Sequence, residues 1–286
     1  MWRSMSFEQQ IELSLIGPFG IGFAALWGAL WGSFFNVVIC RVPAGESLVK
    51  PPSHCRVCGE AVRWYDNIPI LSYLLLRGRC RHCGAGYSIR YMLVELLVAA
   101  LAVVMHQVFV VHGAGEIGLR AGQLVITSLF SGLLVAISLI DYDTRLIPNV
   151  ITYPAIPICA LLSVFMQLPH LWDGPVGAVG GYALIWLIAE GYYRLRKREG
   201  MGLGDAKLMA MIGGLLGWQV LYPVLLLSSL QGVMIAIPLL LLRPRGEGDA
   251  RERGDDREGD DREGDDREGD DREGDDREGD DREGDD

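Results

Sequence analysis

Long apolar runs dominate this chain and limit the folds it can adopt. A helix needs roughly 20 apolar residues to cross about 30 Å of hydrocarbon. Seven segments approach that length, at residues 18–40, 92–111, 122–140, 150–168, 175–193, 206–218 and 220–242. The leader before the first run carries Glu8 and Glu12 against one Arg3, so we expect a retained span there and not a cleaved signal peptide. The sequence therefore predicts an all-α polytopic membrane protein with about seven transmembrane helices.

The negative charge of the chain is concentrated in its last residues. The net charge is −10, but residues 243–286 alone hold 23 acidic and 10 basic side chains, which leaves the rest of the chain at +3. Six copies of Arg-Glu-Gly-Asp-Asp run from Arg257 to Asp286. Such a repeat has no apolar surface to bury against the entropy of ordering. We therefore expect residues 244–286 to be a disordered acidic repeat tail.

Two aspartates stand where apolar runs end. Asp141 begins the sequence Asp-Tyr-Asp-Thr-Arg-Leu-Ile-Pro, and Asp205 ends Gly-Met-Gly-Leu-Gly-Asp. A carboxylate beside a membrane span is costly unless it is paired, hydrated or used, and two carboxylates that share a proton are the chemistry of an aspartic protease. Helix capping is the alternative for each residue. We expect both motifs to be loops, with Asp143 as a rival to Asp141 unless it faces water or pairs with Arg145.

Positive charges predict the orientation of the spans. Residues 41–91 carry eight Lys or Arg and residues 194–198 carry four, whereas residues 112–121 and 169–174 carry only Arg120 between them. The positive-inside rule then places the N-terminus outside. Residues 41–91, both aspartate motifs and the tail are expected in the cytoplasm, on one side of the membrane.

Two Cys-x-x-Cys-Gly motifs lie in this predicted cytoplasmic loop, about 20 residues apart. Their thiols belong to Cys55, Cys58, Cys80 and Cys83. The spacing is typical of a four-thiolate zinc site, and a reducing cytoplasm disfavours disulfides. We interpret the neighbouring His54 and His82 as bystanders. The loop is thus predicted to be a zinc-ribbon-like domain organised by structural Zn²⁺.

Polar and small residues in the first run predict helix packing. Gly20, Ala24, Gly28 and Gly32 recur every fourth position, which permits close approach by a neighbouring helix. Asn36 lies inside the same run and is expected to form an interhelical hydrogen bond.

With these residues in view, the chain resembles the bacterial type IV prepilin peptidases, leader peptidases and N-methyltransferases among the GxGD-type membrane aspartic proteases. The resemblance covers about residues 25–243. It rests on Gly32-Ser33-Phe34 through Arg41-Val42-Pro43, both cysteine pairs, Trp64-Tyr65-Asp66-Asn67-Ile68-Pro69, Ser88-Ile89-Arg90-Tyr91 and the two aspartate motifs. The family continues into a final helix, where this chain enters the acidic repeat.

The resemblance implies a reaction and its residues. The family pattern places one aspartate seven residues before the Ile-Pro proline, here Pro148, which implies Asp141 and Asp205 as the catalytic pair. It implies cleavage of type IV prepilins or pseudopilins after glycine, at the bacterial inner membrane. S-adenosylmethionine-dependent N-methylation of the new N-terminus would follow. Candidate methyl-transfer residues are Asn67, Arg90, Tyr91 and Glu95, each with a structural role as the alternative.

The predicted organisation has four parts: an N-terminal segment with the first helix (1–40), a zinc-binding domain (41–91), a transmembrane peptidase domain (92–243) and the tail (244–286). The expected partners are the prepilin-like substrate and the lipid bilayer, with no nucleic acid. Three alternatives stay open: a transporter that uses the aspartates as ion ligands, a scaffold that binds partners through its zinc loop, and a peptidase that does not methylate.

Overall fold

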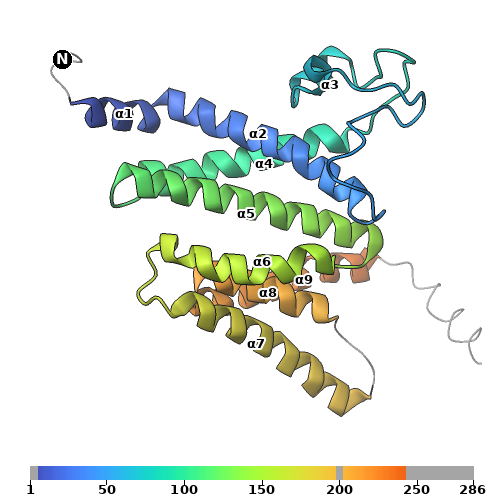
Figure 1. Cartoon of the computed structure of the whole chain (residues 1–286). Coiled ribbons are helices and arrows are strands. Elements are labelled where there is room, and N and C mark those ends of the chain that lie inside the picture. The colour runs from blue at the N-terminus through green and yellow to red at the C-terminus, as the bar shows by residue number, and fades with distance from the viewer. Residues whose placement is uncertain (1–5, 198–201, 243–286) are drawn as a thin grey trace, which may run out of the picture. The chain divides into compact units, whose positions relative to one another are not determined.

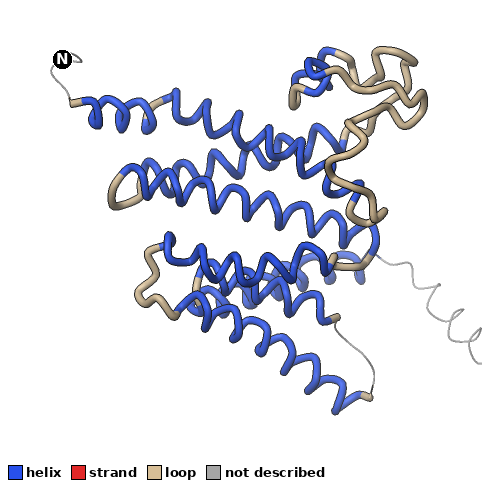
Figure 2. Tube along the Cα trace, viewed as in Figure 1, coloured by secondary structure: helices blue, strands red, loops and turns tan. Residues whose placement is uncertain are grey.

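Helices and loops account for the part of the chain that this computed structural model describes, residues 6–197 and 202–242 (Figure 2). The longer helices are α1 (Phe7–Ile16), α2 (Pro18–Arg41), α4 (Arg90–Met105), α5 (Ile117–Thr144), α6 (Asn149–Leu162), α7 (Asp173–Arg196), α8 (Leu203–Leu216) and α9 (Leu221–Leu242). Short elements are η2 (Trp64–Asn67), α3 (Leu71–Leu75), η3 (His106–Val111), η4 (Ser163–Met166) and η5 (Trp218–Val220). The predicted all-α character is therefore confirmed for the described residues.

The chain divides into two compact units, residues 1–225 and 226–286. The described part of the second unit, residues 226–242, is the continuation of helix α9. The predicted acidic tail lies outside the described residues.

Each of the seven predicted spans coincides with a helix. Five helical segments are long and apolar enough to cross a membrane: Pro18–Arg41, Arg90–Val111, Ile117–Thr144, Asn149–Met166 and Trp218–Leu239. Helices α7 and α8 do not meet both criteria, and α8 has 14 residues, about 21 Å at 1.5 Å per residue. The chain is thus a polytopic helical membrane protein, and the count of seven stays a prediction.

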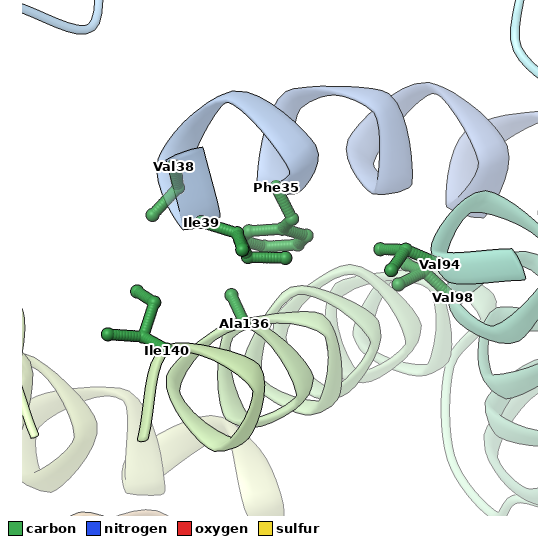
Figure 3. Close-up of a cluster of buried hydrophobic side chains, with 7 residues drawn as sticks. All are labelled: Phe35, Val38, Ile39, Val94, Val98, Ala136 and Ile140. Atoms are coloured by element: carbon green, nitrogen blue, oxygen red, sulfur yellow. The ribbon is translucent and has the colours of Figure 1, made fainter. Parts of the chain in front are cut away.

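Helices α2, α4 and α5 pack around one buried apolar cluster. Phe35, Val38 and Ile39 of α2 point toward Val94 and Val98 of α4 and toward Ala136 and Ile140 of α5 (Figure 3). The predicted small-residue face of α2 lies against α4, because a Cβ atom on Gly28 would come within 2.7 Å of Ala102 Cβ. Asn36 Nδ2 donates to the Tyr91 carbonyl at 2.9 Å, which is the expected interhelical hydrogen bond.

Helix α8 packs against α6 and α7. Its contact with α7 is backbone to backbone: a Cβ on Gly177 would come within 2.1 Å of the Gly213 carbonyl oxygen, and one on Gly181 within 2.4 Å of the Met209 oxygen. Contacts this close are possible only because the residues on the facing side of α7 are glycines. On its other side, α8 contributes Met211 to a buried cluster with side chains of α5 and α6.

Candidate active site and metal centre

The two cysteine motifs fold into matching turns within the loop between α2 and α4. The amide of Gly59 donates to the Cys55 carbonyl at 2.8 Å, and the amide of Gly84 donates to the Cys80 carbonyl at 2.9 Å. Both glycines have positive φ angles, 73° and 72°, a conformation that glycine adopts without steric cost. Each turn therefore exposes its two sulfur atoms to the other turn.

The four predicted ligand sulfurs converge. The Sγ atoms of Cys55, Cys58, Cys80 and Cys83 all lie within 4.8 Å of one another, and those of Cys55 and Cys83 are 3.8 Å apart. Tetrahedral Zn–S bonds of about 2.3 Å place sulfurs about 3.8 Å apart. The residues thus fit a four-thiolate metal site.

Hydrogen bonds within the second cysteine turn favour the thiolate form of Cys80. The backbone amides of Cys83 and His82 donate to the Cys80 sulfur and lower the pKa of this thiol to about 6. The thiolate is the form that ligates metal, so Cys80 offers it at neutral pH. A nearby ion pair between Arg81 and Asp66, at 2.6 Å, holds η2 against the second turn and lowers the pKa of the Asp66 carboxyl.

The aspartates occupy helix ends rather than loops. Asp141 lies in the last turn of α5 and Asp205 in the first turn of α8. The loop expected after Ile140 is wrong, because α5 continues to Thr144 and ends where Arg145 adopts a left-handed φ of 55°. Capping does not explain Asp205 either, since the N-cap of α8 is Gly202.

The side chains of Asp141 and Asp205 lie close enough to interact electrostatically, and both are exposed. A specific contact brings their helix ends together. Ile147, in the loop between α5 and α6, packs directly against Gly204, which has no side chain. A Cβ atom added to Gly204 would come within 2.8 Å of Ile147 Cδ1. The absence of a side chain at Gly204 therefore lets the loop after Asp141 approach the residue before Asp205.

Asp143, the rival carboxylate, is already paired. Arg90 at the start of α4 donates from both terminal nitrogens to its two oxygens, each at 2.8 Å, and a further 3.3 Å bond reaches the Leu139 carbonyl. Asp143 neither stands free nor pairs with its neighbour Arg145 in this structure. Asp141 is the member of this turn that interacts electrostatically with Asp205.

A buried lysine beside this site was not predicted from the sequence. Lys207 is only 9% exposed, although it lies two residues after Asp205. Its ammonium donates to Asn149 Oδ1 and lies 4.7 Å from the centre of the Tyr153 ring. It thereby ties the start of α6 to α8. Asn149, directly after the Ile-Pro pair, is the polar residue that could have indicated this contact. Its partner Lys207 is 58 residues away in the sequence, so the pairing could not be predicted.

Three of the four candidate methyl-transfer residues contact other residues through their side chains, and each has a different partner. Arg90 holds Asp143, the Tyr91 hydroxyl lies 3.4 Å from Cys40 Sγ, and Glu95 Oε2 accepts the Ile70 amide at 2.7 Å. Asn67 lies exposed in η2. Their part in methyl transfer stays a prediction.

Family models match both halves of the membrane region. Residues 26–109 match the bacterial peptidase A24 N-terminal domain, and residues 128–237 match the type IV leader peptidase family. A protein of Myxococcus xanthus (strain DK1622) called prepilin leader peptidase/N-methyltransferase is 38% identical over 85% of this chain and 72% of its own length. The chain belongs to the prepilin leader peptidase/N-methyltransferase family.

Other members of the prepilin leader peptidase/N-methyltransferase family match at similar levels. A Pseudomonas putida protein of that name is 36% identical over 89% of this chain and 90% of its own length, and one from Neisseria gonorrhoeae is 35% identical over 82% and 87%. No solved structure matches the chain.

Proposed function

We propose that this protein is a membrane aspartic endopeptidase and N-methyltransferase that acts on type IV prepilins or pseudopilins. Its relatives are named for these two activities. The observation that supports the peptidase assignment is the electrostatic interaction between Asp141 and Asp205, which come from different helices, while Asp143 is paired with Arg90. The leader would be cut after its terminal glycine, and the new N-terminal residue would then be methylated.

The pair can perform peptide hydrolysis without any other catalytic group. The mechanism requires one carboxyl of the pair in its ionised form and the other in its protonated form. The ionised carboxylate takes a proton from water, which attacks the peptide carbonyl carbon, while the protonated carboxyl donates to the carbonyl oxygen. Collapse of the tetrahedral intermediate breaks the C–N bond, and the amine leaves with a proton from the pair. Lys207 and Ile147 position the helix ends that carry these groups.

The cysteine cluster has a structural part in this proposal. Cys55, Cys58, Cys80 and Cys83 would hold one Zn²⁺ ion, which organises the loop when bound. S-adenosylmethionine would supply the methyl group. Asn67, Arg90, Tyr91 and Glu95 stay candidates for this reaction, without an assigned step.

We infer the orientation of the protein in the membrane from the distribution of its positive charges. We place the protein in the bacterial inner membrane with its N-terminus outside and with the zinc-binding domain (41–91) and the tail (244–286) in the cytoplasm. The N-terminal segment (1–40) and the peptidase domain (92–243) supply the spans. The zinc loop and both aspartates share one end of the helices, as the Arg90–Asp143 pair and the Ile147–Gly204 contact indicate.

A single reconstitution tests both activities. The purified full-length protein in phospholipid vesicles is mixed with a prepilin and S-adenosylmethionine, and the substrate is analysed by intact mass. We expect loss of the leader together with a gain of one methyl group. Loss of the leader alone would leave a peptidase without methylation, and an unchanged substrate mass would contradict the proposed function.

A further inference from the structure

Apolar side chains cover the outside of the segment between the two cysteine motifs. Trp64 is 81% exposed, Leu74 is 59% exposed and Leu75 is 73% exposed, and Leu71 and Ile68 in the same segment are exposed as well. Neither the cysteine cluster nor the aspartate pair uses these side chains. Contiguous exposed apolar patches of this kind mark sites of contact with a membrane or another molecule.

A hydrogen bond to Glu95 sets how far this segment reaches from the ends of the helices toward the interior of the membrane. The carboxylate of Glu95 accepts the Ile70 amide directly before α3, at 2.7 Å. Arg90, paired with Asp143, marks the polar end of α4. Glu95 is five residues further along α4, so its Cα lies about 7.5 Å deeper in the span at 1.5 Å per residue. The hydrogen bond therefore draws the start of α3 below the level of the Arg90–Asp143 pair.

A second contact also places Glu95 away from the helix ends. The Glu95 carboxylate also interacts with the side chain of Ser33 on α2. Ser33 precedes Arg41, the last residue of α2, by eight residues, or about 12 Å of helix. In Figure 1, α3 is correspondingly folded back along the direction of α2, while the rest of the loop extends past the helix ends.

The chemistry of the segment matches the interface of a bilayer. Tryptophan is enriched at the headgroup level of membranes, and leucines on a short helix can enter the acyl boundary beside it. Arg77 and Arg79, both exposed, follow α3 directly. Their stems can lie along apolar surface while their charges reach anionic headgroups.

We propose that residues 64–79 lie at the membrane surface, with α3 inserted into the bilayer leaflet on the side of the zinc loop. The partner of this segment is anionic phospholipid. The loop between α2 and α4 is then not wholly in water. This inference does not depend on the proposed function, because it concerns contact with lipid alone.

The test uses photo-crosslinking to lipid in the full-length protein. Benzoylphenylalanine replaces Leu75 or, in a second variant, Leu74, and each protein is reconstituted into vesicles of phosphatidylethanolamine and phosphatidylglycerol. The matched control carries the same group at Val49, an apolar residue of the same loop that is 80% exposed. Its segment is held at the end of α2 by the hydrogen bond from Arg41 to the Ser47 carbonyl.

After irradiation, we expect a mass shift of one phospholipid on both α3 variants and none on the Val49 variant. Phosphatidylglycerol should be over-represented in the adduct relative to its share of the vesicle. Absence of lipid from both α3 variants, or equal labelling at Val49, would overturn the proposal. So would an adduct with an added prepilin in place of lipid, which would make the surface a substrate site.

Discussion

In the proposed mechanism, the chemistry depends on Asp141 and Asp205. We expect Asp141→Asn and Asp205→Asn each to lower the rate of leader cleavage by at least about 100-fold, because the amide keeps the size of the side chain but cannot exchange the shared proton. The measurement is the fraction of prepilin processed at fixed time, with equal amounts of each variant in the membrane. Processing at the wild-type rate by either variant would exclude the aspartic mechanism.

Asp143→Asn is the matched control on the same turn of α5. Its carboxylate binds Arg90 rather than Asp205, so the variant should keep most of its cleavage activity. Loss of activity in this variant alone would show that the wrong member of the Asp-Tyr-Asp motif has been assigned.

The contacts of these residues were only partly predictable. The positions of the aspartates at the ends of apolar runs made them candidates, and the family resemblance favoured Asp141 over Asp143. The partner of Asp143 does not, because Arg145 is its sequence neighbour whereas Arg90 lies 53 residues away. The buried Lys207 was likewise missed, since a helical pattern shows which residues share a face and not what they meet on the next helix.

At the scale of elements, Gly204 sets the approach of α8 to the loop after α5. Gly204→Ala should push the new Cβ into Ile147, with an overpacking cost of about 1–3 kcal/mol. If half of that cost, about 0.5–1.5 kcal/mol, is added to the barrier of the reaction, cleavage falls by about two- to tenfold. The initial rate of cleavage in vesicles measures the effect.

Two further variants separate this contact from a general effect on helix α8. Gly202→Ala adds the same methyl group where no crowding atom is nearby, so its rate should stay close to wild type. Ile147→Ala combined with Gly204→Ala removes the side chain that is struck and should recover part of the lost rate. Equal losses in Gly202→Ala and Gly204→Ala would contradict the role of the contact.

The cysteine turns form a second element with a separate test. We expect about one zinc per purified chain, and we expect Cys80→Ser to lose it, since a hydroxyl is a poor substitute for a thiolate ligand. The loop should then open to limited proteolysis. Cys40→Ser, outside the cluster, is the control that should retain the metal by elemental analysis; equal metal content in both variants would contradict the site.

Helix positions were the most predictable elements, because the thickness of a bilayer sets the length of an apolar run. Their ends were less predictable. Asp141 to Thr144 read as a polar loop but continue α5 by one turn, since no proline or glycine interrupts the helix there. The folding back of α3 had no signal in the hydrophobic pattern, because it depends on one carboxylate in another helix.

For the whole molecule, the acidic tail is expected to be dispensable for chemistry. Residues 246–286 carry 23 acidic and 8 basic side chains, a net charge of −15, and none of the aspartate or cysteine motifs. Truncation after Arg245 should therefore preserve cleavage, measured as processed prepilin per unit of membrane-inserted enzyme. Complete loss of cleavage at unchanged membrane levels would show that the repeat takes over the role of the family's final helix.

The backbone contact between α7 and α8 has a consequence for how a substrate gains access. Gly177 and Gly213 meet without side chains, so this contact has no rotamer that could change to make room. Ile147 contacts Gly204 at the opposite end of α8, and its side chain can rotate. We therefore expect α7 and α8 to move together as one wall of the site, and any extra room for an extended peptide beside Asp205 to come from side chains such as Ile147.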